Sequence, residues 1–466
     1  MTNSICGNNQ QLRNVLEAIN AEPAGISFII DAEKKLVGVV TDGDFRRLLL
    51  SGKKLEDPLL ETDYNNCVVA SQGEDIHALI KKTNKKVRII PIIDDKGYPI
   101  DYFRYEHKTR FTPVAEPSLT SKELEYLTDA FLSTWISSRG KYIDRFEIEF
   151  AQYVDCKFGV ATSNGTVAIH LALVALGVGK GDEVIVPDLT FAATINAVLH
   201  CGATPVIVDV EKERWTISPH EMEAAITENT KAIIPVHIYG QPCEMDEIMR
   251  IANKHKLFVV EDCAEAHGAM YSGKKVGSFG HISTYSFFGN KILTTGEGGM
   301  CVTTDVDLDG KMRVLRDHGM SPTKKYWHDE IGFNYRMTNL QAAIGCAQLE
   351  RIDSILSSRF RIEETYRKCL AELNEITWQL DFQEAKRVVW LVSILVKKKN
   401  RNEIIRKLKE QNIDARPFFY PLSKMPIYEQ YSTKECKNAQ MLSSTGINLP
   451  TVEDVDLSKI ATAFNL

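Results

Sequence analysis

The chain has 466 residues, of which 44% are hydrophobic and 25% charged, a composition typical of a globular protein with about three domains. Its net charge of -6 argues against a general nucleic-acid-binding role, because such proteins carry a basic face. The longest apolar run, 388–396, is too short to span a membrane, and the first helix is not preceded by an apolar signal core. The ten cysteines form no C-x-x-C pair, so we expect reduced thiols, a cytoplasmic location and no metal site.

The first region, residues 1–107, carries a repeated pattern. The pattern predicts a helix, two strands joined by a charged turn and a second helix at 10–21, 25–30, 36–40 and 45–50. A helix, a strand and a turn recur at 75–82, 87–93 and 94–97. Two copies in about 100 residues indicate an internal repeat.

Residues 25–47, G-I-S-F-I-I-D-x(4)-L-V-G-V-V-T-D-G-D-F-R-R, resemble part of a CBS-domain pair, a module that often binds adenine nucleotides. The resemblance implies that Thr41 and Asp44 contact a nucleotide through its ribose or phosphate. The second copy lacks the T-x-x-D motif after Ile100, so at most one site is expected. The alternative is a packing or dimerising module without a ligand.

The rest of the chain predicts a second, larger α/β region after a Pro-containing linker at 108–120. A helix is expected at 121–133, and strands and helices alternate between about 140 and 305, as in a mostly parallel sheet. Residues 339–373 are predicted to be helical, and 388–396 and 401–411 predict a further strand and helix. We therefore expect a large domain over 121–355 and a smaller α/β domain over 356–466.

Three segments of this region carry chemically useful groups. Ser163-Asn-Gly-Thr166 lies between a predicted strand and helix, where free amide groups bind anions such as phosphate. Asp262 follows a buried strand, and Glu265 lies three residues on. Lys291 lies between an aromatic segment and a glycine-rich loop, where desolvation would make its amine nucleophilic. Taken singly, these residues also fit a turn, a helix cap and a surface lysine.

Taken together, the segments resemble the DegT/DnrJ/EryC1/StrS family of sugar aminotransferases, which have the type I fold of enzymes that use pyridoxal phosphate (PLP). The resemblance covers about residues 111–466 and includes T-W-I-S-S-R-G-K-Y-I (134–143), G-D-E-V-I-V-P-D-L-T-F (181–191), P-V-H-I-Y-G-Q (235–241) and G-F-N-Y-R-M-T-N-L-Q-A-A-I-G (332–345). It implies a large PLP-binding domain, a smaller C-terminal domain, and an active unit that is at least a homodimer.

The same resemblance implies a role for each matching residue. Lys291 would bond covalently to PLP and carry the proton, Asp262 would pair with the pyridinium nitrogen, and Glu265 would lie near the ring and its 3-hydroxyl. Phe191 would stack on the PLP ring, and Gly165, Thr166 and Ser286 would contact its phosphate. Asn334 would contact the phosphate of the PLP in the neighbouring subunit. Arg416 and Tyr420 would contact the nucleotide sugar, although Ser423 stands where the family commonly has histidine.

The resemblance implies that L-glutamate gives its amino group to a nucleotide-linked 4-keto-6-deoxy sugar for surface polysaccharide synthesis. Residues 286–300 and 416–422 resemble most closely the members that act on a GDP-linked sugar. The alternatives are a UDP- or dTDP-linked sugar, a dehydratase, and a non-catalytic regulator that binds PLP. The intact Lys291 disfavours the dehydratase, which has histidine there, and the CBS-like pattern disfavours the regulator, which usually carries a helix-turn-helix.

Overall fold

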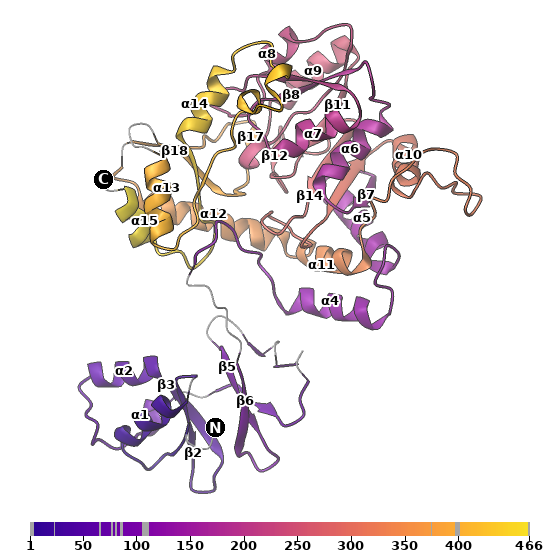
Figure 1. The fold of residues 1–466 in the computed structure, drawn as a ribbon. Helices are drawn as coiled ribbons and strands as arrows, with labels where there is room; N and C mark the ends of the chain where they lie inside the picture. The colour runs from indigo at the N-terminus through magenta and orange to yellow at the C-terminus, as the bar shows by residue number, and fades with distance from the viewer. Residues whose placement is uncertain are drawn as a thin grey trace. The chain divides into compact units, whose positions relative to one another are not determined.

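The computed structural model describes residues 4–22, 24–64, 67–75, 78–79, 82–83, 87–104, 111–373, 375–396 and 401–464. The chain divides into two compact units, Met1–Thr109 and Arg110–Leu466, which we call the N-terminal and C-terminal units (Figure 1). The division falls inside the predicted linker at 108–120. The described residues include no helix that is long and apolar enough to cross a membrane.

The N-terminal unit contains two three-stranded sheets with the same topology, which agrees with the predicted repeat. In each sheet a short strand runs parallel to the central strand, which pairs with an antiparallel strand. Both antiparallel pairs shift register at the same place, between Ile29 and Ile30 and between Ile92 and Ile93. The elements are β1 (Ile5–Gly7), α1 (Leu12–Ala21), β2 (Ile26–Ile30), β3 (Leu36–Thr41), α2 (Asp42–Leu50), η2 (Glu61–Asp63), β4 (Ala70–Ser71), β5 (Ile89–Ile93) and β6 (Pro99–Arg104).

The two copies contact each other inside this unit. Phe28 of β2 and Tyr102 of β6 stack with their ring centroids 5.8 Å apart. The Tyr102 hydroxyl donates to Glu22 at 2.7 Å, and the Leu36 amide donates to the Gly97 carbonyl at 2.9 Å. The predicted helix at 75–82 lies partly outside the described residues. The CBS-like identity of the unit stays a prediction.

A seven-stranded sheet forms the centre of the C-terminal unit (Figure 1). Its order is β7-β15-β14-β11-β10-β8-β9, and only β15 runs antiparallel to its neighbours, so the sheet is mostly parallel as expected. The strands are β7 (Phe158–Thr162), β8 (Glu183–Pro187), β9 (Thr204–Val208), β10 (Thr230–Ile233), β11 (Phe258–Asp262), β14 (Ile282–Ser286) and β15 (Gly299–Thr303).

Helices pack against this sheet through apolar residues, and α5 shows the pattern clearly. Phe146 and Phe150, one turn apart, are both buried and contact the Phe287 ring at 5.1 Å. The helices up to the end of the large core are α4 (Ser121–Leu132), α5 (Lys141–Tyr153), α6 (Gly165–Ala175), α7 (Ala192–His200), α8 (Pro219–Ala224), η3 (Ile238–Gly240), α9 (Met245–His255), α10 (Val306–Arg316), α11 (Asn339–Leu349) and α12 (Ile352–Cys369). Thr120 caps α4, because its hydroxyl forms a capping box with Glu123.

The C-terminal part has a second apolar core around a four-stranded antiparallel sheet, in the order β16-β18-β20-β19. This core lies within the predicted smaller domain, but Arg110–Leu466 form one compact unit and α12 runs through the expected boundary at 355/356, so the division stays a prediction. Its elements, with a small sheet made by β12, β13 and β17, are β12 (Met270–Tyr271), β13 (Lys274–Lys275), β16 (Ile376–Trp378), β17 (Ala385–Lys386), β18 (Val392–Val396), α13 (Arg401–Glu410), β19 (Arg416–Pro417), η4 (Leu422–Lys424), η5 (Glu429–Tyr431), α14 (Lys437–Thr445), β20 (Gly446–Leu449) and α15 (Leu457–Phe464).

The strand predicted at 388–396 begins only at Val392. The four residues before it are buried but bond elsewhere: the Val388 amide donates to the Gly240 carbonyl at 3.1 Å, and the Trp390 indole donates to the Asn290 carbonyl at 2.9 Å. This departure from the strand brings the Trp390 ring next to Lys291.

Candidate active site

The structure brings the three predicted catalytic residues together in the C-terminal unit. Asp262 is the last residue of β11, Glu265 follows it, and Lys291 follows β14, the neighbouring parallel strand. The Lys291 amine lies 3.3 Å from a Glu265 carboxylate oxygen and 4.1 Å from the centroid of the Trp390 ring. Because parallel strands end at one edge of the sheet, sequence-distant side chains converge there.

Asp262 is 5% exposed and is held by two donors: the Thr194 hydroxyl at 2.9 Å and the Ala264 amide at 3.1 Å. Burial raises the pKa of Asp262, while these hydrogen bonds and the charge of Lys291 oppose the rise. A carboxylate fixed in this way is suited to a hydrogen bond with a cationic ring nitrogen, and the predicted contact with PLP stays a prediction.

Glu265 is equally enclosed. One carboxylate oxygen accepts from the Tyr239 amide at 2.9 Å and the other from the Lys291 amine. Burial raises the pKa of Glu265, and the Lys291 charge acts in the opposite direction. The lysine therefore lies between an acidic partner and the face of an indole ring, a setting that fixes the direction of its amine.

The predicted phosphate contacts also come together. Asn164 caps α6 by accepting from the Val167 amide at 3.0 Å, and the first amides of a helix have no intrahelical acceptor. Gly165 lies so close to Ser286 that an added Cβ would be 2.7 Å from the serine Cβ, so only glycine fits. The amides of Gly165 and Thr166, with the Ser286 hydroxyl, thus fit a phosphate at a helix N-terminus.

Two further predicted PLP contacts are exposed. Phe191 precedes α7, is 58% exposed, and lies 5.7 Å from the Phe419 ring. Asn334 is exposed, and its side-chain oxygen accepts from Arg336 at 3.0 Å. Its predicted contact is with the PLP of a neighbouring subunit, so that role stays a prediction.

The predicted nucleotide-sugar residues lie on the segment that begins at β19. Arg416 is exposed and pairs with Asp414 at 3.0 Å, and Tyr420 is 56% exposed. Ser423 forms a connection that the sequence did not predict: its amide and hydroxyl donate to the two carboxylate oxygens of buried Asp188 at 2.7 and 2.8 Å. This pair ties the segment to the strand end that carries Phe191.

In the N-terminal unit, Thr41 and Asp44 form a capping box at the start of α2. The Asp44 carboxylate accepts from the Thr41 amide and hydroxyl at 3.0 and 2.6 Å, and it pairs with Arg47. This arrangement gives the motif a structural role. Its predicted contact with a nucleotide stays a prediction.

His237, Glu261 and Cys263 form a fully buried cluster beneath the site. Glu261 accepts hydrogen bonds from His237, from the Ser283 hydroxyl, and from three amides, those of Gly277, Phe279 and Gly280. The Cys243 amide donates to Nδ1 of His237 at 3.0 Å, so Nε2 is the ring nitrogen that donates to Glu261. The cluster therefore functions as a hydrogen-bond network that anchors β11.

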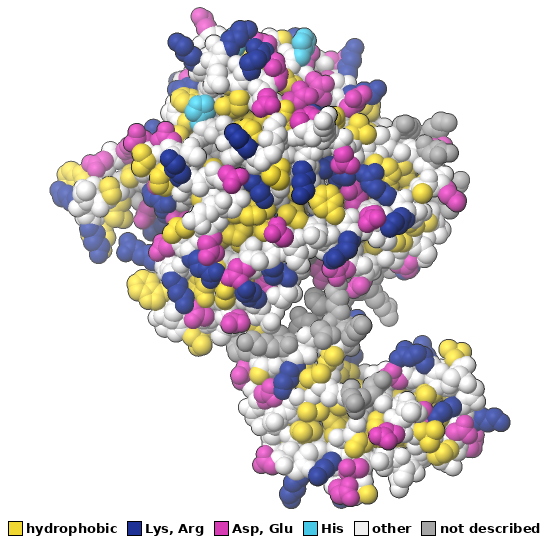
Figure 2. All heavy atoms as spheres, turned by 180° about the vertical axis from the view of Figure 1, so that it is seen from behind, with side chains coloured by type: hydrophobic (Ala, Val, Ile, Leu, Met, Phe, Trp, Pro, Cys, Tyr) yellow, Lys and Arg dark blue, Asp and Glu magenta, His cyan; other side chains and the backbone are white. Residues whose placement is uncertain are grey.

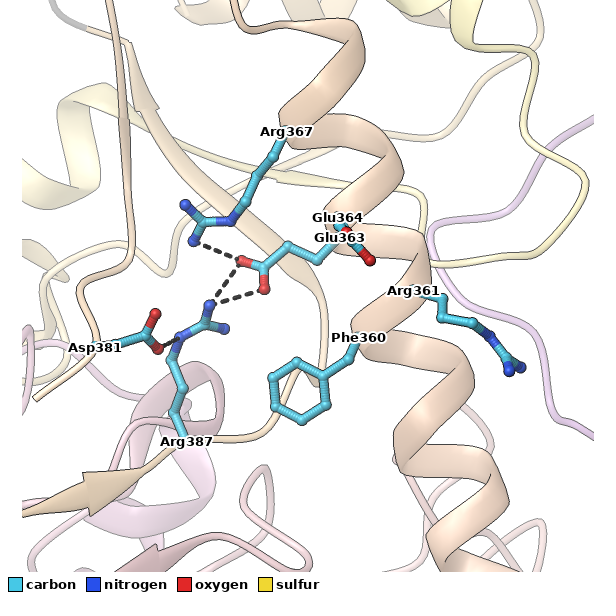
Figure 3. Close-up of a pocket in the computed structure, with 7 residues that line it drawn as sticks. All are labelled: Phe360, Arg361, Glu363, Glu364, Arg367, Asp381 and Arg387. Atoms are coloured by element: carbon cyan, nitrogen blue, oxygen red, sulfur yellow. Dashed lines mark hydrogen bonds and ion pairs between the residues drawn. The ribbon is translucent and has the colours of Figure 1, made fainter. Parts of the chain in front are cut away.

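A pocket beside α12 contains a matched set of charges (Figure 3). Glu363 pairs with Arg367 at 3.1 Å and with Arg387 at 2.8 Å, and Arg387 also pairs with Asp381. The pocket is lined by Phe360, Arg361, Glu363, Glu364, Arg367, Asp381 and Arg387. One turn earlier on α12, Arg359 donates to the carbonyls of Trp390 and Lys291. We interpret the pocket as a structural feature whose ion pairs hold α12 against the segment that carries Asp381 and Arg387.

His267 predicts how stability depends on pH. The ring is fully buried among Phe150, Tyr285 and Phe287, and burial lowers the pKa of His267 to about 3. In the unfolded chain this histidine binds a proton below about pH 6.5, whereas in the folded chain it stays neutral. The free energy of unfolding therefore decreases as the pH is lowered, by about 2 kcal/mol between pH 7 and pH 5. Denaturant unfolding at pH 7 and pH 5 should show a loss in the wild type and a smaller one in His267→Phe, in which the part due to His267 is removed while burial still lowers the pKa of His170 and His281. The exposed-histidine control His220→Gln should follow the wild type.

Sequence reasoning missed Thr194, Tyr239 and Trp390 as parts of the site. Tyr239 lies in the segment 235–241, where no local pattern indicates its role, and Trp390 lies in an apolar run that predicts a strand. Thr194 lies in the first turn of α7, and its hydroxyl next to a strand end is a usable signal in the sequence.

The family model described as the DegT/DnrJ/EryC1/StrS aminotransferase family matches residues 117–465. The chain is 47% identical to a GDP-perosamine synthase from Caulobacter vibrioides, over 76% of this chain and 97% of the relative. It is also 47% identical to a GDP-perosamine synthase from Escherichia coli O157:H7, over 73% and 93% of the two chains.

A sugar aminotransferase from Streptococcus pneumoniae has a similar structure. It is 27% identical, with a TM-score of 0.72, and the match covers 76% of this chain and 96% of that one. It has been solved in forms with PLP and with pyridoxamine phosphate. The predictions of a PLP-type α/β fold, of PLP as cofactor and of an aminotransferase are confirmed. The chain belongs to the DegT/DnrJ/EryC1/StrS aminotransferase family.

Proposed function

We propose that the protein transfers the amino group of L-glutamate to C4 of GDP-4-keto-6-deoxymannose and so forms GDP-perosamine for surface polysaccharide such as O-antigen. The carrying observation is the convergence of Lys291, Glu265 and Asp262 in a chain 47% identical to two GDP-perosamine synthases. The ten free cysteines are compatible with the proposed cytoplasmic location.

The site residues divide the work. PLP supplies the electron sink for the amino transfer. Asp262 holds a proton on the ring nitrogen through its fixed carboxylate, and Thr194 and Ala264 keep that carboxylate in place. Lys291 gives and takes the proton at the reacting carbon, while Glu265 and Trp390 fix the direction of its amine. Gly165, Thr166 and Ser286 bind the phosphate.

A panel of nucleotide-linked keto sugars tests this function. With L-glutamate as donor, the full chain should aminate the GDP-linked sugar with the highest kcat/KM, and UDP- and dTDP-linked sugars should be poorer acceptors. A UDP or dTDP sugar with the higher kcat/KM would replace the proposed acceptor. The absence of amination with every sugar would contradict the function itself.

We also propose that the active enzyme is a homodimer. At the end of α4, the apolar side chains of Phe131, Leu132 and Trp135 are 64%, 73% and 58% exposed, more than a lone surface usually leaves uncovered. A second copy is the proposed occupant, because exposed Asn334 is expected to complete the neighbour's phosphate site.

On the face drawn in Figure 2, basic and acidic side chains of the described residues are interspersed, unlike the basic face of a nucleic-acid-binding protein.

The N-terminal unit is proposed to bind one nucleotide and to regulate the enzyme. The supporting observations are its compactness, its repeated β-sheet topology and its position before the family match, which begins at residue 117. Regulation requires that the nucleotide bind two enzyme states with different affinities, typically by about 5–150-fold.

Calorimetry on the full chain and on a chain that begins at Lys108 tests this proposal. We expect the full chain to bind an adenine or guanine nucleotide that the shorter chain does not bind, and we expect this nucleotide to change turnover of the full chain only. If neither chain binds a nucleotide at the N-terminal unit and both have the same rate and oligomeric state, the unit has no regulatory role.

A further inference from the structure

Tyr239 is a bulky, fully buried residue in an unusual backbone conformation. Its φ and ψ are 50° and 28°, in the left-handed region that bulky side chains rarely adopt. Such a conformation persists only where surrounding contacts hold it, and it is concentrated at functional sites. The turn is held from both sides, since the His237 amide donates to the Asp262 carbonyl at 3.1 Å and the Gly240 carbonyl accepts from the Val388 amide at 3.1 Å.

The left-handed turn lets Tyr239 contact two parts of the active site at once. Its amide donates to one oxygen of Glu265 at 2.9 Å, and the other oxygen of that carboxylate accepts from Lys291. Its hydroxyl accepts from the amide of Phe419 at 2.9 Å, and the two residues are 180 positions apart in the sequence. The residue therefore lies between the lysine and the segment that carries Arg416 and Tyr420.

The Tyr239 ring strengthens the same connection. It is nearly parallel to the Trp390 ring, at 5° and 6.0 Å between centroids, and it stacks on Phe419 at 23° and 5.5 Å. The two rings that contact Tyr239 reach further into the site: Trp390 contacts Lys291, and Phe419 contacts Phe191. Burial raises the pKa of Tyr239 well above its usual value, so the hydroxyl stays protonated and neutral.

We infer that Tyr239 is a positioning residue that fixes the segment 416–420 relative to Lys291 and thereby sets the affinity for the nucleotide-linked sugar. This inference rests on the proposed function. The residue would not take part in the glutamate half-reaction directly, because its hydroxyl bonds to the Phe419 amide and only its backbone amide contacts Glu265.

Tyr239→Phe removes the hydroxyl and leaves the ring and the amide. We expect KM for the nucleotide-linked keto sugar to rise about tenfold, since the Phe419 amide loses its acceptor and the segment is no longer fixed. The glutamate half-reaction, followed by cofactor absorbance in a stopped-flow instrument, should keep its rate. The Kd of GDP-mannose, a probe with no keto group, should rise by a similar factor in calorimetry.

Tyr366→Phe is the matched control. Tyr366 is also fully buried, but its hydroxyl donates to the Pro450 carbonyl at 2.9 Å in the second core. This variant should lose a comparable hydrogen bond without a change in KM or Kd. Equal KM and Kd in the wild type and Tyr239→Phe, or equal changes in both variants, would overturn the inference. Wild-type amination in the same assay tests the proposed function separately.

Discussion

Lys291→Ala should abolish transamination, with a loss of at least about a thousandfold in kcat/KM. The change removes the amine that is proposed both to bond to PLP and to move the proton, and alanine offers neither function. The Glu265 oxygen that accepts from Lys291 also loses this partner. The purified variant should lack the visible absorption band of lysine-linked PLP, and coupled assays should detect no more than residual amine transfer.

Lys231→Ala is the control for this result. Lys231 also forms an ion pair, with Asp182 at 3.0 Å, at the beginning of β8 and β10 rather than at the active-site edge. Its variant should keep the absorption band and near-normal turnover. If Lys291→Ala kept near-normal turnover, the assignment of the reacting lysine would be wrong.

Asp262→Asn should fold and bind PLP but lose at least about a hundredfold in kcat, because an amide cannot keep the ring nitrogen protonated as a carboxylate does. Each tenfold loss corresponds to about 1.4 kcal/mol in the barrier. The variant should keep its geometry, since the asparagine oxygen can accept from the Ala264 amide while its NH2 group donates to the Thr194 hydroxyl.

The comparison for Asp262→Asn is Asp182→Asn, which removes a carboxylate charge from a loop before β8. Asp182 accepts from the Gly179 amide at 2.9 Å and from Lys231, both outside the active site. The control should retain activity. A comparison of kcat for the two variants should distinguish the loss of a carboxylate charge beside the PLP ring from the loss of one elsewhere in the chain. Activity of Asp262→Asn within about threefold of the wild type would argue against the pyridinium role.

The sequence predicts the convergence of Asp262, Glu265 and Lys291 because their signals are local. Asp262 ends the strand β11, which begins with an apolar run, and Gly165 begins α6 shortly after the apolar strand β7. Lys291 follows the more polar strand β14 and precedes a glycine-rich loop. Loops after neighbouring parallel strands must converge at one edge, so the pattern of strands already implies the site. The family resemblance then supplied the individual roles.

The residues that the sequence did not predict are held by long-range contacts. The Trp390 indole bonds to a carbonyl 100 residues away, and the Tyr239 hydroxyl bonds to an amide 180 residues away. An apolar run such as 388–396 cannot show that its first half will leave the strand to bond with Gly240. Strands of two or three residues, such as β1 and β4, carry too short a pattern to be recognised.

The most direct test of the account is one absorbance experiment on the full chain with PLP bound. L-Glutamate alone should remove the band of lysine-linked PLP, and subsequent addition of GDP-4-keto-6-deoxymannose should restore it while the sugar gains an amino group. This sequence of changes requires both half-reactions on lysine-linked PLP. A chain with bound PLP whose band does not respond to glutamate, or whose band is not restored by any nucleotide-linked keto sugar, would contradict the proposed aminotransferase.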